Sequence, residues 1–192
     1  MQTVLAYLLV FASWLAMVGL DMPRSILVPL IRQRGRVVRR MDRSSAWAIV
    51  VADNVTFMLA GAFIVLGGGG LPALLFYIGT GMMIAGIALR QWAMSALGRF
   101  WAPTVRIVVG HRTVTSGPYR YVRHPSYTGA LLFMMGLCIA AQSIIVVALG
   151  AAILIPAYIY RIRKEEAALS KHVHGYCSYM RSVSRLLVPG LF

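Results

Sequence analysis

Acidic residues and cysteines are both scarce in this sequence. Asp and Glu together number five among 192 residues, and charged residues of both signs make up 12% of the chain, against roughly a quarter in soluble globular proteins. The two cysteines provide neither a disulfide framework nor the spacing of a zinc ribbon. Hydrophobic residues instead make up 59%. These figures exclude a soluble domain, a disordered tail and a secreted disulfide scaffold, and they indicate an integral membrane protein.

Five apolar runs approach or exceed the length of membrane helices, for which about 18 apolar residues are typical. We predict an all-α membrane bundle with five spans, at residues 1–20, 46–66, 71–92, 125–141 and 143–160. The first run lacks the small-residue cleavage site of a signal peptide, so we treat it as a helix. The last two runs are short and meet at a tight turn. We expect them to pair as an antiparallel hairpin, with a kink at Pro156.

Basic residues lie on one side of this five-span arrangement. The 19 Lys and Arg residues, which contribute to a formal net charge of +14, fall at or after the ends of the first, third and fifth runs. None lies before the first run, in the tetraglycine turn at 67–70 or in the turn at Gln142. Because basic loops stay in the cytoplasm, we predict an external N-terminus and a cytoplasmic C-terminus. The distribution also suits anionic lipid headgroups, and we expect no nucleic-acid partner.

The densest polar and aromatic cluster is the stretch 117–129, Gly-Pro-Tyr-Arg-Tyr-Val-Arg-His-Pro-Ser-Tyr-Thr-Gly. It indicates a turn, a short basic segment and a helix that begins with Pro125 in its first turn. The positive end of a helix dipole and its free N–H groups favour an anion such as a carboxylate. The simpler interpretation is an anchor with Arg and Tyr at headgroup depth. The residues of this stretch alone favour neither.

A second cluster follows the fifth run. It is the segment 161–166, Arg-Ile-Arg-Lys-Glu-Glu, which contains two of the five acidic residues. Arg161 and Glu165 are four residues apart and therefore share a helix face. The plain interpretation is that the two carboxylates offset nearby cations at a membrane surface. A functional role is the alternative.

These clusters and their neighbours resemble, in order and spacing, the isoprenylcysteine carboxyl methyltransferase family, within the wider group that includes phospholipid N-methyltransferases. The resemblance covers residues 97–189, about half the chain, and the first three spans share only number and hydrophobicity with the family. The residues that carry it are Leu97-Gly98-Arg99-Phe100-Trp101, His111-Arg112-Thr113-Val114, Gly117-Pro118-Tyr119, Arg123 to Gly129, Arg161, Glu165-Glu166, Tyr176, Tyr179, Arg185 and Pro189.

The resemblance implies a methyltransferase that uses S-adenosylmethionine without a Rossmann sheet. Residues 1–96 would form a three-span membrane region, and residues 97–192 the catalytic region with a cytoplasmic cofactor pocket. A lipophilic acceptor would enter from the bilayer, with membrane lipids as further partners. Arg161 would bind the acceptor and, with Glu165, form the catalytic pair. The cofactor contacts would be His111, Arg112, Thr113, Val114, Tyr119, His124, Pro125, Ser126, Tyr127 and Glu165.

The acceptor most like that of the family is the carboxylate of a prenylcysteine, which would undergo O-methylation. Related small membrane methyltransferases act on phospholipid amines or small thiols, so N- or S-methylation is the alternative. A non-enzymatic membrane protein would explain the spans and arginines equally well, but not the Tyr, His and Glu residues gathered on one side. A reductase would need a nicotinamide site, and no Gly-x-Gly-x-x-Gly run is present.

Two weaker signals concern an intramembrane acid and a metal. Asp53 falls inside the second predicted span, where an ionisable residue is a functional candidate by default. We favour a buried pair between Asp53 and Arg90, which ends the third span on the same side. The spacing of His172, His174 and Cys177 matches no standard zinc site, so we expect no metal.

The one-sided distribution of Lys and Arg predicts the outcome of topology mapping. Reporter fusions at Gly69 and Gln142 should report an external location, and a fusion at Val38 an internal one. An alkaline phosphatase and fluorescent protein pair measures both. An external signal at Val38 would contradict the five-span arrangement.

Overall fold

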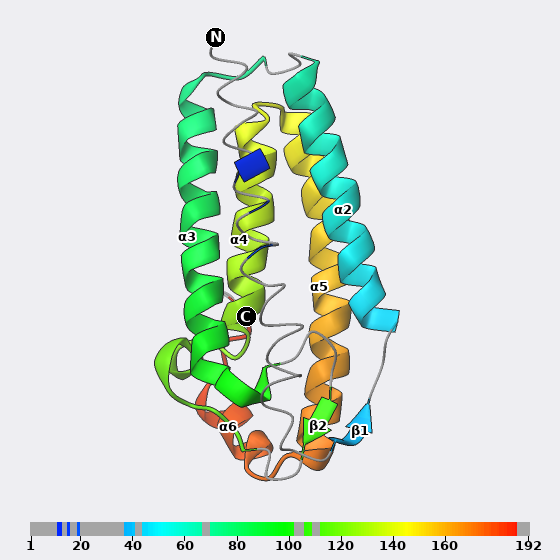
Figure 1. Cartoon of the computed structure of the whole chain (residues 1–192), viewed down its shortest axis with the longest axis vertical. Coiled ribbons are helices and arrows are strands. Elements are labelled where there is room, and N and C mark those ends of the chain that lie inside the picture. Colours follow the sequence, from blue (N-terminus) through cyan, green and yellow to red (C-terminus); the bar gives the residue numbers. More distant parts are fainter. Residues whose placement is uncertain are drawn as a thin grey trace.

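The structure is a computed structural model that describes residues 37–40, 44–66, 70–101, 106–108 and 112–187, with isolated residues 11, 12, 15 and 19. Four long helices form the bundle (Figure 1). Their bounds are α2 (Ser44–Val65), α3 (Leu74–Leu97), α4 (Pro125–Ala140) and α5 (Ile144–His172). The predicted span at 1–20 lies almost entirely outside the described residues.

Three of these helices, α2, α3 and α5, are long and apolar enough to cross a membrane. α4 has only 16 residues, which at 1.5 Å per residue gives roughly 24 Å, less than the ~30 Å of a hydrocarbon core. The prediction of a helical membrane bundle is therefore confirmed, with three candidate spans among the described residues. The count of five spans stays a prediction.

Helix α5 is much longer than the predicted fifth span. It begins after Ser143, whose hydroxyl accepts a hydrogen bond from the Val146 N–H at 3.5 Å. It then continues through Pro156 and past the predicted end at Tyr160 as far as His172. The polar segment 161–166 therefore lies on the same rigid helix as the apolar run.

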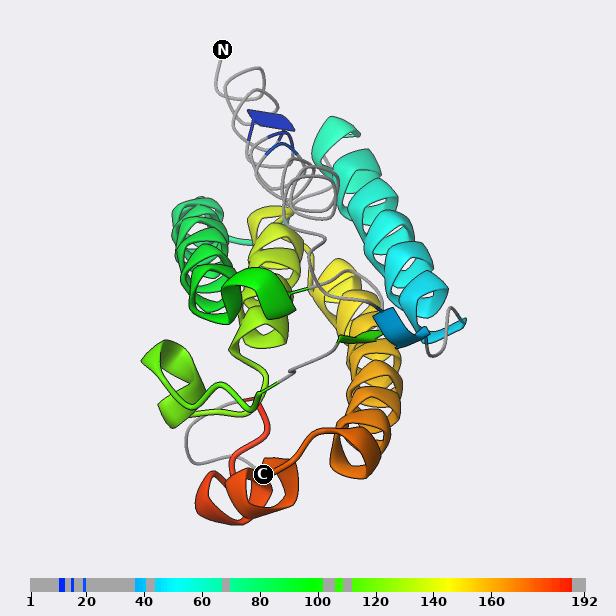
Figure 2. The ribbon, with the colours of Figure 1, turned by 60° about the horizontal axis from the view of Figure 1, so that its bottom comes forward.

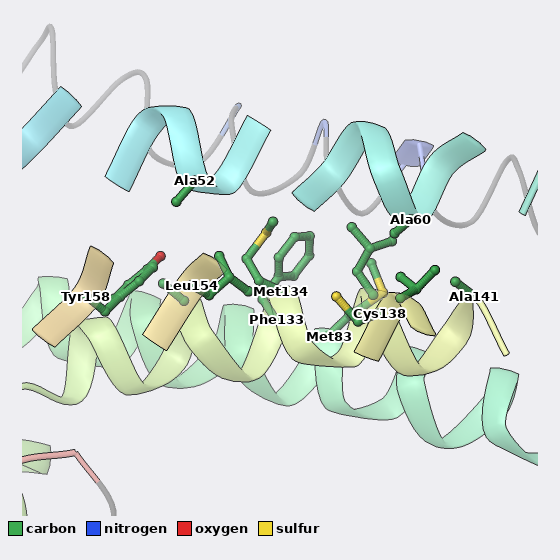
Figure 3. Packing of buried hydrophobic residues seen from close by; sticks show 12 residues of the cluster. Ala52, Ala60, Met83, Phe133, Met134, Cys138, Ala141, Leu154 and Tyr158 are labelled. Atoms are coloured by element: carbon green, nitrogen blue, oxygen red, sulfur yellow. The ribbon is translucent and has the colours of Figure 1, made fainter. Parts of the chain in front are cut away.

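The helices pack as two pairs, with α4 mainly against α3 and α5 mainly against α2 (Figure 2). The expected α4–α5 hairpin exists, and its turn places Gln142 at a φ of 53°. The interior between the pairs is apolar: small residues of α2, such as Ala52 and Ala60, face larger ones of α4 and α5, such as Phe133 and Leu154 (Figure 3).

Glycines allow α3 and α4 to approach very closely. A Cβ added at Gly86 would lie 2.6 Å from the carbonyl oxygen of Gly129, and one at Gly136 would lie 2.7 Å from that of Gly79. The two glycines on each helix are seven residues apart, so they form two facing pairs along the antiparallel interface. Small residues serve this purpose in membranes, where close van der Waals contact drives helix association.

A pair of short strands was not predicted. Two short strands, β1 (Val37–Arg40) and β2 (Arg106–Val108), form an antiparallel pair with Val37 opposite Val108. They lie at the same end of the bundle as the short helix α6 (Tyr176–Ser182) (Figure 1). The pair is too short to show a strand period in the sequence, and it joins segments about 70 residues apart. The all-α prediction therefore holds for the helical bundle, and this strand pair is the exception among the described residues.

The glycine interface predicts a contrast between two alanine substitutions on α3. Gly86→Ala should lower the stability of the bundle by about 1–3 kcal/mol, because the new methyl group meets the backbone of α4. Gly81→Ala is the matched control, since Gly81 is exposed and nothing lies within 4 Å of its added Cβ. Thermal unfolding in detergent measures both. Equal melting temperatures for the two variants would contradict the close approach.

Candidate active site

The start of α4 is held in place by the C-terminal segment. The backbone N–H of Arg123 donates to the carbonyl of Arg185 at 2.9 Å, and that of His124 donates to Leu186 at 3.1 Å. The Thr128 hydroxyl donates to the Leu187 carbonyl at 2.6 Å. Two segments about 60 residues apart therefore meet at the residues that resemble a cofactor site.

These bonds also change the expectation of an anion site at the helix start. Tyr127 and Thr128 direct their N–H groups to the His124 carbonyl, both at 3.0 Å, and Pro125 has no N–H. In this first turn, the bonds described leave only the Ser126 N–H for a ligand. Side chains, and not a row of free backbone N–H groups, must therefore supply most of the polar contacts of the site.

The central polar contact of the site joins α4 and α5. The Tyr127 hydroxyl donates to Oε2 of Glu165 at 2.5 Å and accepts from Nε of Arg161 at 3.0 Å. The direct Arg161–Glu165 separation is 3.9 Å, which is an ion pair beyond hydrogen-bond distance. Tyr127 therefore mediates between a cation and an anion that share one helix face.

Arg161 is almost completely buried, with 2% of its surface exposed. Its Nη1 donates to the hydroxyl of Ser45, on α2, at 2.9 Å. A buried charge is costly unless it is paired and hydrogen-bonded. Three helices therefore contribute to the surroundings of this one guanidinium.

The second glutamate of the pair has different partners. Oε1 of Glu166 lies 2.8 Å from Nε of Arg123 and 3.1 Å from Nε2 of His124. The His124 ring also stacks on Tyr127, with centroids 5.7 Å apart and planes at 24°. Glu166 is thus engaged in fixing the start of α4, whereas Glu165 faces Tyr127 and Arg161.

Three tyrosines form a buried layer beside these charges. The Tyr179 hydroxyl donates to the carbonyl of Tyr119 at 2.7 Å, and burial raises the pKa of Tyr179 to about 12, partly offset by Arg123. Burial, and then the negative charge of Glu165, raise the pKa of Tyr119 well above its usual value.

Tyr176 differs from its neighbours because its buried hydroxyl has no hydrogen-bond partner among the described residues. Burial raises the pKa of Tyr176 well above the usual tyrosine value, and the charges of Glu166 and Glu165 raise it further. An unsatisfied buried hydroxyl costs free energy, so this atom is suited to a polar ligand.

The intramembrane acid has a hydrogen-bond partner that the sequence did not predict. Asp53 accepts from the Tyr158 hydroxyl at 3.1 and 3.2 Å, while Arg90 donates to Ser126 at 3.2 and 3.3 Å. The hydrogen-bond donor to Asp53 is therefore Tyr158, and the Asp53–Arg90 pair stays a prediction. Packing pairs α2 with α5, so the acid meets a tyrosine of that helix.

The other predicted cofactor contacts differ in burial and in their hydrogen-bond partners. The Thr113 hydroxyl donates to the His174 carbonyl at 3.2 Å, next to α6. Pro125 is buried, Val114 is half-buried and Arg112 is exposed. His111 lies outside the described residues. Sequence reasoning missed Ser45 and Tyr158, because a serine and a tyrosine in an apolar run carry no local signal of such contacts.

Comparison with known proteins gives the same family as the resemblance. Residues 79–171 match the isoprenylcysteine carboxyl methyltransferase (ICMT) family. The chain is similar in fold to the eukaryotic intramembrane Ras methyltransferase ICMT, with a TM-score of 0.58 and 21% sequence identity. That similarity covers 96% of this chain and 68% of the other. The described helical bundle, together with its polar end (the end that carries β1, β2 and α6), therefore has an ICMT-like fold.

Relatives among curated proteins divide into two kinds. The uncharacterized protein YpbQ of Bacillus subtilis is 24% identical over 164 residues, which cover 83% of this chain and 97% of YpbQ. A probable protein-S-isoprenylcysteine O-methyltransferase of Oryza sativa subsp. indica is 37% identical over 62 residues, 31% of this chain and 32% of the plant protein. The chain thus matches about a third of the plant protein's length, at higher identity.

The tyrosine layer predicts opposite effects for two conservative variants. Tyr179→Phe should lower stability by about 1–3 kcal/mol, because it leaves the buried Tyr119 carbonyl without its donor. Tyr176→Phe should leave stability unchanged or raise it, because the lost hydroxyl has no partner among the described residues. Thermal unfolding in detergent without added ligand measures both. Equal losses would show that the Tyr176 hydroxyl is satisfied.

Proposed function

We propose that this ICMT-like protein is a membrane methyltransferase that uses S-adenosylmethionine to methylate the carboxylate of a prenylated cysteine. The observation that carries the proposal is the Arg161–Tyr127–Glu165 contact at the polar end of an apolar bundle. It places a buried cation beside a partly exposed anion. The two suit an anionic acceptor and the polar groups of a cofactor, respectively.

The residues present are suited to S-adenosylmethionine. The unsatisfied Tyr176 hydroxyl is a buried polar atom that a polar ligand would complete. The Glu165 side chain keeps 26% of its surface exposed and would accept hydrogen bonds from an amino group or ribose hydroxyls. His124 and Tyr127, which stack on each other, provide aromatic surface beside it. By resemblance, the segment 111–114 and Tyr119 complete this set.

The chemistry asks little of the protein beyond positioning. S-Adenosylmethionine supplies, when bound, a methyl group already activated by its sulfonium. The acceptor carboxylate is ionised at pH 7, so it needs no general base. Arg161 would hold one carboxylate oxygen and leave the other aligned with the methyl carbon. The cofactor would supply the methyl group for the new C–O bond, with its C–S bond broken and S-adenosylhomocysteine as the leaving group. In-line positioning and exclusion of water then dominate the rate.

The site favours a carboxylate over the amine of a phospholipid. An amine acceptor must lose a proton, which requires a base. Glu166 is engaged by Arg123 and His124, and the raised pKa values of Tyr176 and Tyr179 keep their hydroxyls protonated at neutral pH. A buried guanidinium would also repel an ammonium headgroup. O-methylation therefore fits these residues better than N-methylation.

Two measurements test the proposal directly. Titration calorimetry on the protein in detergent should show binding of S-adenosylhomocysteine. Protein in lipid nanodiscs should transfer a labelled methyl group to N-acetyl-S-farnesylcysteine and not to phosphatidylethanolamine. Absence of both binding and transfer would refute the proposed function. Transfer to the phospholipid alone would replace the acceptor and keep the reaction class.

Substitutions at Glu165 and Arg161 should have separable effects. Glu165→Gln should weaken S-adenosylhomocysteine binding by roughly 10- to 150-fold, because a charge-assisted hydrogen bond worth about 1.5–3 kcal/mol is lost. Arg161→Gln should leave that affinity within a few-fold and depress methyl transfer instead. Arg161→Lys should not restore full activity if the planar guanidinium is required.

Arg163→Gln is the matched control for Arg161, since Arg163 is exposed on the same helix two residues away. It should change neither cofactor affinity nor turnover. If Arg161 and Glu165 merely pair with each other at the membrane surface, their variants will lose stability in parallel. Identical effects on binding and transfer would therefore contradict the separate roles.

A further inference from the structure

Helix α2 begins with two serines that both reach α5. The Ser45 hydroxyl is fully buried and accepts from Nη1 of Arg161 at 2.9 Å. The Ser44 hydroxyl is exposed and lies 3.4 Å from that of Tyr160. Both serines precede residues 79–171, the region that matches the ICMT family. A residue outside that region therefore contacts the arginine assigned to the acceptor.

Hydrogen bonds on two different nitrogens hold the Arg161 guanidinium from α4 and α2. Nε binds Tyr127 and Nη1 binds Ser45. A planar group held at one nitrogen can rotate about that bond, whereas a second bond fixes its plane. The bonds come from α4 and α2, so the orientation depends on the packing of separate helices.

Loss of Ser45 would leave Glu165 as a competing partner. Its Oε2 already lies 3.9 Å from Nε of Arg161 on the same helix face. A buried guanidinium that loses a partner favours the nearest anion. Rotation of Arg161 onto Glu165 would pair the side chain assigned to the acceptor with the side chain assigned to the cofactor. Neither would then be available to its ligand. The Ser45 bond, on Nη1, instead holds the guanidinium at a nitrogen other than the one nearest Glu165.

A second polar contact, between Asp53 and Tyr158, joins α2 to α5 further along the two helices. Asp53 lies eight residues after Ser45, about 12 Å further along α2, and it accepts from Tyr158. Tyr158 precedes Arg161 by three residues, and its ring packs edge-on against Tyr127 with centroids 5.8 Å apart. With α2 fixed at this second point, Ser45 stays in register with Arg161.

We propose that Ser45 is a positioning residue that aligns Arg161 with the carboxylate of the acceptor. This inference rests on the proposed function, because it assumes that Arg161 binds the acceptor. It gives the N-terminal membrane region a defined part in the reaction, because α2 supplies a hydrogen bond that orients the acceptor arginine.

The experiment compares binding of N-acetyl-S-farnesylcysteine with binding of its methyl ester to protein in nanodiscs. The two probes share the prenyl chain and differ only in the carboxylate. The native protein should prefer the acid. Ser45→Ala should reduce the acid-to-ester preference by about tenfold and leave S-adenosylhomocysteine affinity within a few-fold. Ser45→Thr, which keeps a hydroxyl, should retain most of the preference.

Ser44→Ala is the matched control and should keep the native preference. In an Arg161→Gln background, Ser45→Ala should add no further loss, because Ser45 acts through the arginine. If Ser45→Ala does not fold, Ser45→Cys, a weaker acceptor, should give an intermediate preference. A native preference in Ser45→Ala, or in Ser45→Cys if only that variant folds, would overturn the inference. So would an additive loss in the Arg161→Gln background.

The outcomes also separate this inference from the proposed function. If the native protein binds neither S-adenosylhomocysteine nor the acid, the proposed function fails and the inference fails with it. If the native protein transfers methyl groups but binds acid and ester equally, the function stands and the role of Ser45 is refuted. Loss of S-adenosylhomocysteine binding in Ser45→Ala, parallel to the loss of preference, would indicate general damage and also refute it.

Discussion

A buried guanidinium at the edge of an apolar bundle is the interaction around which this site is organised. Arg161 cannot stay charged in an apolar environment without partners on several sides, and one helix cannot provide them all. Ser45 comes from α2, Tyr127 from α4 and Glu165 from α5 itself. The site consequently exists only when the helices are packed correctly, and the stability of the bundle and the geometry of the site are linked.

The position of Tyr127 depends in turn on how α4 is held. On one side, facing glycines bring α3 and α4 into backbone contact, and Arg90 of α3 donates to Ser126. On the other side, the segment 185–187 binds the start of α4 through two backbone bonds and the Thr128 hydroxyl. The first turn of a short membrane helix is thereby fixed from within the bundle and from the polar end.

In this arrangement Glu165 and Glu166 have different partners, and α2 and the region that matches the ICMT family contribute different contacts. Glu166 is engaged in holding the start of α4, which leaves Glu165 as the partly exposed carboxylate beside Tyr127. The region that matches the ICMT family contributes the charged groups, while α2 contributes the contacts that orient them.

The sequence by itself determined the membrane class, the four long helices and the similarity to the ICMT family, because these depend on local properties: the length of apolar runs, helix spacing and a short motif. It also placed Arg161 and Glu165 on one helix face, since four residues make about one turn. Only the tertiary structure decided that Ser45 contacts Arg161, that Asp53 binds Tyr158, and that β1 pairs with β2. These contacts join residues about 70 to 116 positions apart, and packing alone decides which helices meet.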